Sequence, residues 1–314
     1  MNSAIRGVVA AITTPFLEAG EPDLARLIER AGRLLDGGCD GLNLLGTTGE
    51  ATSQSVGQRI AVMRAVGASA LPLERMIVGT GAAALRDASL LTREAAEIGF
   101  SAALLLPPFY YKPVSDAGIL RFVEAVAEAT ASTPIPLYLY NFPALSGIAY
   151  TPELVALLVR HFGSRIAGLK DSSGDIAYAR QVAAISPALA VYPSNEATLL
   201  SARSGGPFAG CISATANLNA ADCALAYHNG DEAALERAIR LRAIFDGLPL
   251  VPGVKAMVSR LENDIAHART LPPLAPLESA QLDKLLGRYA ALGRLASPEH
   301  QSASNAEERH AGRV

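Results

Sequence analysis

The alternation of short apolar segments with longer amphipathic segments constrains the fold of this chain more than any other feature. Eight short runs of apolar or β-branched residues predict buried strands, and alanine-rich segments of helical period separate most of them. This alternation is typical of parallel strands joined by crossover helices. The predicted strands are Val8–Thr13, Gly41–Leu45, Met76–Gly79, Ala102–Leu106, Ile135–Tyr140, Ile166–Lys170, Ala190–Pro193 and Gly210–Ser213.

The helices expected between these strands complete the pattern. Ser115 and Thr151 are predicted N-caps, and Pro152 suits the first turn of the helix that follows Thr151. Eight strands within about the first 220 residues favour a closed (β/α)8 TIM barrel over an open doubly wound sheet. The predicted helices are Asp23–Asp36, Ser55–Ala68, Asp87–Ile98, Asp116–Thr130, Pro152–Phe162, Ile176–Ile185 and Thr198–Ser204.

After the eighth strand the pattern becomes entirely helical. We therefore expect a barrel with the active site over residues 1–220 and a C-terminal helical domain over residues 221–296. Residues 297–314 are polar and contain no aromatic side chain, which predicts a disordered tail. The predicted C-terminal helices are Asn219–Tyr227, Glu232–Phe245, Val254–Ala268 and Ser279–Leu292.

Charge and cysteine usage exclude several classes of function. The 314-residue chain has a formal net charge of -3 and a sequence pI near 6.0, so no basic surface for nucleic acid or a membrane is expected. Without a secretory leader pattern or a long apolar segment, a cytoplasmic location is predicted. Cys39, Cys211 and Cys223 lack metal-ligand spacing, and the five histidines are scattered singly, so no metal site is expected.

Lys170 is the first candidate for chemistry, because it ends the apolar segment Ile166–Leu169. In a barrel of this class, the active site lies at the carboxyl ends of the strands. A buried lysine there loses hydration, which favours the neutral amine and makes it a nucleophile toward a carbonyl. For a lone lysine, a side chain that extends to solvent is the commoner interpretation.

The residues at neighbouring strand ends favour the catalytic interpretation. Gly46–Glu50 follows the second strand, and its glycines and threonines could bind a small anion, although a plain turn fits this segment equally well. The aromatic segment Pro107–Pro113 follows the fourth strand, and Tyr138 and Tyr140 share one face of the fifth. An amine, tyrosine hydroxyls and paired threonines together suit a carbonyl substrate.

Three motifs carry a resemblance to a known family: Gly46–Glu50 (GTTGE), Tyr140–Pro143 (YNFP) and Gly168–Asp175 (GLKDSSGD). With support from Pro108–Tyr110 and Gly210–Asn217, the chain resembles the dihydrodipicolinate synthase / N-acetylneuraminate lyase family of pyruvate-dependent class I aldolases. The resemblance covers most of residues 5–295. It implies a (β/α)8 barrel with a C-terminal helical domain, a homotetramer built as a dimer of dimers, and no metal or organic cofactor.

The resemblance also implies roles for individual residues. Lys170 would form the Schiff base with pyruvate or a 2-keto acid, and Tyr140 would be the general acid and base beside it. Thr47 and Thr48, with Gly46 in the same segment, would hold the substrate carboxylate.

Two further positions match the family. Tyr110 corresponds to a tyrosine that the synthases contribute to a neighbouring subunit, where it joins a proton relay with a threonine, here Thr47. Ile212 corresponds to a position whose backbone carbonyl lies near the lysine.

Departures from the family patterns bear on the substrate. The synthases carry an arginine shortly after the tyrosine, whereas Leu145 occupies that place and cannot make a bidentate contact with a carboxylate. The sialic acid lyases place an adjacent Asp and Glu after the seventh strand, whereas this chain has Glu196 and Ala197. Together with Ser146, Ser194 and Asn195, these departures predict a cavity entrance that binds a shorter polyhydroxylated chain without a second carboxylate near Leu145.

The sequence therefore predicts retro-aldol cleavage of a 2-keto-3-deoxy sugar acid, such as 2-keto-3-deoxygluconate, to pyruvate and an aldehyde. Other activities of the same lysine chemistry stay open: dihydrodipicolinate synthase, N-acetylneuraminate lyase, hydroxy-oxo-glutarate aldolase, and dehydratase of a keto-deoxy sugar acid. A non-enzymatic, pyruvate-binding regulatory barrel is a further alternative. The presence of both Lys170 and Tyr140 argues against it.

Overall fold

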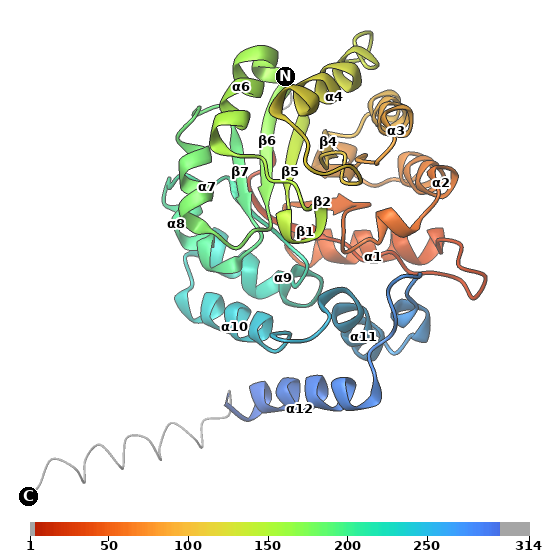
Figure 1. Ribbon diagram of the computed structural model, residues 1–314. Coiled ribbons are helices and arrows are strands. Elements are labelled where there is room, and N and C mark those ends of the chain that lie inside the picture. The colour runs from red at the N-terminus through yellow and green to blue at the C-terminus, as the bar shows by residue number, and fades with distance from the viewer. Residues whose placement is uncertain (1–3, 296–314) are drawn as a thin grey trace, which may run out of the picture.

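The protein folds as a (β/α)8 barrel, as the sequence predicts (Figure 1). The computed structural model describes residues 4–295. Its eight strands are parallel where they pair and run in the order β7-β6-β5-β4-β3-β2-β1-β8. The amide of Ala209, directly before β8, donates to the carbonyl of Val191 in β7 at 2.9 Å and so closes the barrel. The strands are β1 (Gly7–Ala11), β2 (Gly41–Leu44), β3 (Met76–Gly79), β4 (Ala102–Leu105), β5 (Leu137–Asn141), β6 (Ile166–Asp171), β7 (Ala190–Pro193) and β8 (Gly210–Ser213).

The strands are buried on both faces, which explains their continuous apolar runs. Successive side chains of a strand point to opposite faces. In β1, Val8 and Ala10 join the core between the sheet and the helices, whereas Val9 and Ala11 join the core inside the barrel. The inner core also contains Tyr140, so the tyrosine expected at the active site belongs to the barrel interior.

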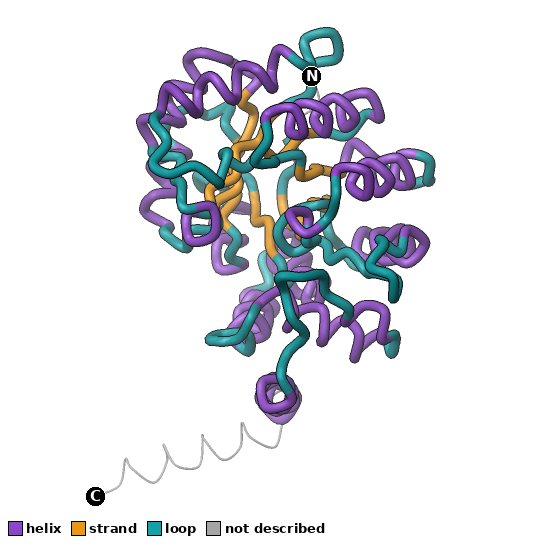
Figure 2. Tube along the Cα trace, turned by 45° about the vertical axis from the view of Figure 1, so that its right-hand side comes forward, coloured by secondary structure: helices purple, strands orange, loops and turns teal. Residues whose placement is uncertain are grey.

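The barrel helices lie around the sheet, as the tube view shows (Figure 2). The two expected N-caps are confirmed: the Ser115 hydroxyl accepts from the amide of Gly118, and the Thr151 hydroxyl accepts from that of Leu154. The four-residue helix α5 (Pro143–Ser146) was not predicted, because it is too short to show a helical period. The others are α1 (Leu24–Asp36), α2 (Val56–Gly67), α3 (Leu85–Ile98), α4 (Asp116–Glu128), α6 (Pro152–Phe162), α7 (Ile176–Ala183) and α8 (Leu199–Arg203).

The C-terminal helices are α9 (Ala216–Ala224), α10 (Glu232–Ala243), α11 (Leu250–Glu262) and α12 (Ser279–Leu295). In the view of Figure 1, α10 and α11 lie below the barrel and α12 lies beyond them. No helix within residues 4–295 is long and apolar enough to cross a membrane. The tail predicted over residues 297–314 lies outside the described residues.

The prediction of a single helix over Val254–Ala268 is wrong. The chain forms α11 and then a separate 3-10 turn, Ile265–Ala268, because Asn263 adopts a left-handed conformation with φ of 51°. Asparagine tolerates this conformation better than most residues, so it can end a helix as glycine does.

A fully buried ion pair joins α11 to the barrel. The ammonium of Lys255 contacts the carboxylate of Glu50, the last residue of the GTTGE segment, and donates to the carbonyl of Thr14 at 2.9 Å. The second carboxylate oxygen of Glu50 accepts from the amide of Leu271 at 2.7 Å. The glutamate of this motif therefore connects the end of β2 to the C-terminal helices.

Removing one partner of this pair should destabilise the protein strongly. In Lys255→Met the carboxylate of Glu50 stays buried without its counterion, so we expect a loss of about 3–5 kcal/mol in the free energy of unfolding, measured in urea. The control is Arg64→Met, which removes a 2.8 Å ion pair between Glu94 and the mostly exposed Arg64 and should cost at most about 1 kcal/mol. Equal losses in the two variants would contradict the structural role of the Lys255–Glu50 pair.

Candidate active site

Lys170 lies inside the barrel at the carboxyl end of β6 and is only 3% exposed. Its ammonium lies 4.6 Å from the centre of the Tyr140 ring and donates to Oδ1 of Asn43 at 3.2 Å. Tyr140 and Lys170 are paired positions of the neighbouring strands β5 and β6. The parallel register therefore places the lysine beside the tyrosine, as the sequence predicts.

Burial lowers the pKa of Lys170 from its ordinary value of 10.5, because the ammonium loses its hydration. Tyr140 opposes part of this effect by favouring the charged form. The net effect lowers the pKa of Lys170, so a larger fraction of this side chain is the neutral amine near pH 7 than for a lysine in water. The neutral amine is the form that attacks a carbonyl.

Thr47 connects the segment after β2 to the tyrosine. Its hydroxyl lies 3.0 Å from the Tyr140 hydroxyl, so a proton can pass between the two oxygens. Thr47 and Thr48 both line a cavity of about 120 Å³ that also contains Lys170. The full lining is Ala11, Thr47, Thr48, Tyr140, Phe142, Lys170, Ser172, Ser194, Ile212, Ala214, Arg242, Leu250 and Val251.

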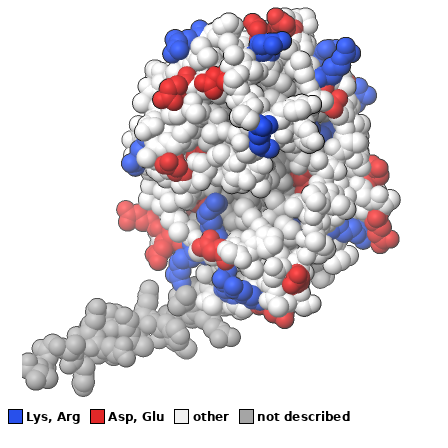
Figure 3. Space-filling model, in the orientation of Figure 1, with Lys and Arg blue, Asp and Glu red and all other residues white. Residues whose placement is uncertain are grey.

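The cavity therefore brings together Lys170, Tyr140, Thr47, Thr48 and Ile212 from the residues predicted on sequence grounds. Seen from outside, the molecule is hollowed between the barrel and the C-terminal helices, and charged side chains of both signs lie at the lower edge of this hollow (Figure 3).

Other predicted residues lie elsewhere. Gly46 lines a smaller adjoining cavity that also includes Thr47 and Tyr140. Tyr110 is 76% exposed and packs edge-on against Tyr111, with ring centres 5.3 Å apart, so within this chain it does not reach the cavity.

Leu145, Ser146 and Asn195 do not line the cavity of Lys170 within this chain. Leu145 is 65% exposed on α5, and the buried hydroxyl of Ser146 donates to the carbonyl of Ile148 at 2.7 Å. The side chain of Asn195 accepts from the amide of Ala197 at 3.0 Å and caps a 3-10 turn. None of these side chains lines the cavity of Lys170, because each is used within its own turn or faces solvent.

Glu196 is also displaced from its expected place. Its side chain is 0% exposed and accepts hydrogen bonds from the hydroxyls of Ser213 and Thr215 and from Arg242. It does not line the cavity. A buried carboxylate is stable only with hydrogen-bond donors around it, and the donors to Glu196 are protein groups.

Several cavity residues were not singled out as site residues from the sequence. Ser172 follows Lys170 by two positions, so the period of a strand was a usable signal. Arg242, by contrast, lies on α10, beyond the last strand, and its local sequence does not distinguish it from Arg237 or Arg240. Leu250 begins α11, so the C-terminal helices form part of the cavity wall.

Within residues 4–295 there is no group of three or more His, Cys, Asp or Glu side chains that could hold a metal ion. The chemistry available at the cavity is that of an amine, hydroxyls and one guanidinium.

The lowered pKa of Lys170 can be measured directly. The chain has only four lysines, Lys112, Lys170, Lys255 and Lys284, so ¹³C-methylated lysine signals are few enough to resolve by NMR. We expect the signal that disappears in Lys170→Arg to titrate below pH 10.5, with the amine form gained as the pH rises through that lower pKa. A midpoint at or above 10.5 would show that burial does not activate this amine.

The model of the dihydrodipicolinate synthetase family matches residues 4–288. An uncharacterised DapA-like lyase of Chloroflexus aurantiacus is 33% identical over 294 residues, which cover 90% of this chain and 96% of the relative.

Two solved structures are similar throughout. Dihydrodipicolinate synthase from Agrobacterium tumefaciens superposes with a TM-score of 0.84 and 30% identity, over 91% of this chain and 99% of that structure. YagE from E. coli K12, determined in complex with pyruvate, superposes with a TM-score of 0.82 and 26% identity, over 93% of this chain and 99% of that one.

Proposed function

This chain belongs to the dihydrodipicolinate synthetase family, and on that premise we propose that it cleaves a 2-keto-3-deoxy sugar acid to pyruvate and an aldehyde through a Schiff base on Lys170. Membership makes the chain a carbon–carbon lyase of the aldolase type. The observation that carries the proposal is the buried amine of Lys170, which shares one cavity with Tyr140, Thr47 and Thr48.

The reaction begins at the ketone. The neutral amine of Lys170 attacks C2 of the substrate, the resulting carbinolamine loses water, and a protonated imine remains. The hydroxyls of Thr47 and Thr48 hold the C1 carboxylate, since both residues line the cavity of the lysine. Tyr140 transfers protons during these steps, because its hydroxyl lies 3.0 Å from that of Thr47 and its ring lies against the amine.

Bond cleavage uses the same groups. Tyr140 removes the proton from the C4 hydroxyl, the C3–C4 bond breaks, and its electron pair moves into the imine to give an enamine while the aldehyde leaves. Protonation of the enamine at C3 and attack of water on the imine then release pyruvate and restore Lys170. No organic cofactor is needed, because the imine nitrogen of Lys170 accepts the electron pair.

The choice of substrate rests on two features. Leu145 stands where the synthases of this family carry a carboxylate-binding arginine, and its alkyl group offers no hydrogen bond. Ser172 and Ser194 line the cavity and supply hydroxyls that can pair with substrate hydroxyls. Ser194 was expected near the substrate from the sequence, and Ser172 joins it in place of Ser146, Asn195 and Glu196 as the proposed polyol-binding groups.

We propose a homotetramer for the assembled enzyme. Tyr110 and Tyr111 are 76% and 78% exposed and form one aromatic pair on the loop after β4. Exposed aromatic pairs favour burial against another molecule. A second copy of the chain would receive Tyr110 beside its own Thr47.

A substrate panel tests the activity. We expect pyruvate release from 2-keto-3-deoxygluconate or its galactonate epimer, each assayed free and 6-phosphorylated. N-acetylneuraminate and 4-hydroxy-2-oxoglutarate are run beside them, as is the synthase reaction of pyruvate with aspartate semialdehyde. Activity in the synthase direction alone, with no pyruvate from any keto-deoxy sugar acid, would overturn the substrate assignment.

Removing the Tyr140 hydroxyl should slow the chemical step. In Tyr140→Phe the proton acceptor is lost while the ring stays, so we expect kcat to fall by about 10²–10⁴-fold. Thr47→Val removes the partner of that hydroxyl and should lower kcat in the same direction. The matched control is Tyr138→Phe, two residues earlier on β5, whose hydroxyl lies 3.5 Å from that of Tyr192 and does not line the cavity. Equal losses in Tyr138→Phe and Tyr140→Phe would assign the effect to packing.

A further inference from the structure

Arg242 brings a positive charge to the cavity from outside the barrel. It lies on α10, and its side chain is 31% exposed and lines the same cavity as Lys170 and Tyr140. A guanidinium remains charged at every pH of interest. The cavity therefore contains a permanent cation that the proposed reaction of Lys170 does not use.

The position of this guanidinium is fixed by a buried anchor. Nη1 of Arg242 donates to Oε2 of Glu196 at 3.2 Å and lies 3.4 Å from the hydroxyls of Ser213 and Thr215. Glu196 is itself held by the Ser213 hydroxyl at 2.6 Å and by Thr215. Because the anchor is wholly buried, one end of the guanidinium is held by groups that cannot move freely.

The remaining donors of Arg242 are available. Within residues 4–295, Nε and Nη2 of Arg242 make no hydrogen bond, whereas Nη1 makes the hydrogen bonds to Glu196, Ser213 and Thr215. A guanidinium with two free nitrogens can form a two-point contact with the oxygens of a carboxylate or phosphate. A neutral hydroxyl of the substrate would bind this guanidinium less strongly than a carboxylate or phosphate, because it carries no negative charge.

We propose that Arg242 binds an anionic group at the far end of the substrate, on the fragment that leaves as the aldehyde. This inference rests on the proposed function and narrows its substrate class to 2-keto-3-deoxy acids with a second carboxylate or a phosphate. Leu145 stands on α5 at the place where the synthases of this family carry an arginine. In this chain Arg242, on α10, supplies a guanidinium to the cavity instead. Glu196 acts as a positioning residue that holds Arg242.

The test uses condensation of pyruvate with matched aldehydes by the intact protein. Glyoxylate is compared with glycolaldehyde, and glyceraldehyde 3-phosphate with glyceraldehyde, so that each pair differs in one anionic group. We expect the wild-type protein to show a higher kcat/KM for the anionic member of at least one pair. A larger ratio of kcat/KM, anionic over neutral, for the glyoxylate pair would identify the anionic group as a carboxylate. A larger ratio for the glyceraldehyde 3-phosphate pair would identify it as a phosphate.

In Arg242→Met the ratio of kcat/KM for the anionic over the neutral aldehyde should fall by about 10- to 100-fold, mainly through KM for the aldehyde. Arg242→Lys should retain part of the ratio, because it keeps the charge and loses the planar donor pair. Glu196→Gln should lower the ratio in the same direction, and adding it to Arg242→Met should lower the ratio no further. A general loss of folding would not change this ratio.

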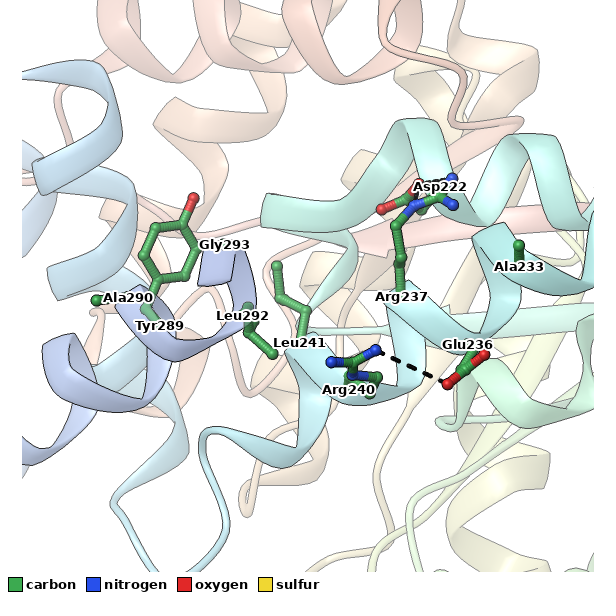
Figure 4. Close-up of a pocket in the computed structure, with 10 residues that line it drawn as sticks. All are labelled: Asp222, Ala233, Glu236, Arg237, Arg240, Leu241, Tyr289, Ala290, Leu292 and Gly293. Atoms are coloured by element: carbon green, nitrogen blue, oxygen red, sulfur yellow. Dashed lines mark hydrogen bonds and ion pairs between the residues drawn. The ribbon is translucent and has the colours of Figure 1, made fainter. Parts of the chain in front are cut away.

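Arg240 offers a control on the same helix. It lies 3.8 Å from Glu236 and lines a separate groove of about 540 Å³ between α10 and α12, with Tyr289 and Leu292 on the opposite wall (Figure 4). Arg240→Met removes a cation at a similar place in the sequence but outside the cavity of Lys170. The ratio for the two aldehydes should therefore equal that of the wild-type protein.

The outcomes separate the two proposals. Equal preference for anionic and neutral aldehydes in the wild-type protein, or an unchanged ratio in Arg242→Met, would overturn the role of Arg242 and leave the lysine chemistry intact. A rise in KM for pyruvate instead of the aldehyde would place Arg242 at the pyruvate carboxylate and would also overturn it. Failure of the wild-type protein to condense any aldehyde with pyruvate, or to release pyruvate from the panel above, would overturn the proposed function itself.

Discussion

The desolvation of one amine is the physical effect on which the proposed chemistry of this structure depends. A lysine inside a barrel is unfavourable as an ammonium, and burial lowers the pKa of Lys170 for that reason. The same effect produces the neutral nucleophile that the proposed reaction requires. The buried amine keeps one hydrogen-bond acceptor inside the barrel, Oδ1 of Asn43 on β2, at 3.2 Å.

The C-terminal helices complete the cavity and are connected to the barrel through polar groups. The buried pair of Lys255 and Glu50 joins α11 to the segment that contains Thr47 and Thr48. The contact of Arg242 with Glu196 joins α10 to the turn after β7. Both connections lie close in sequence to residues of the cavity wall. The helices α10 and α11 therefore form part of the cavity wall.

The sequence predicted the barrel well, because parallel strands buried on both faces leave continuous apolar runs. It also predicted that Lys170, Tyr140 and Thr47 lie together, since strand ends meet at one edge of such a barrel, and all three line one cavity. Their catalytic roles stay predictions. The sequence could not predict whether a polar side chain near the cavity points into it or is buried against other protein groups. Glu196 was expected to bind substrate but is buried among protein donors, and Arg242 gave no local signal because tertiary packing alone brings α10 to the cavity.

The central claim is that Lys170 forms an imine with pyruvate. Incubation of the protein with pyruvate and borohydride, followed by peptide mass spectrometry, tests it directly, because reduction converts the imine into a stable secondary amine. We expect one reduced pyruvate adduct per chain, on the peptide that contains Lys170, and none on Lys112, Lys255 or Lys284. The absence of an adduct, or its presence on another lysine, would contradict imine formation at Lys170.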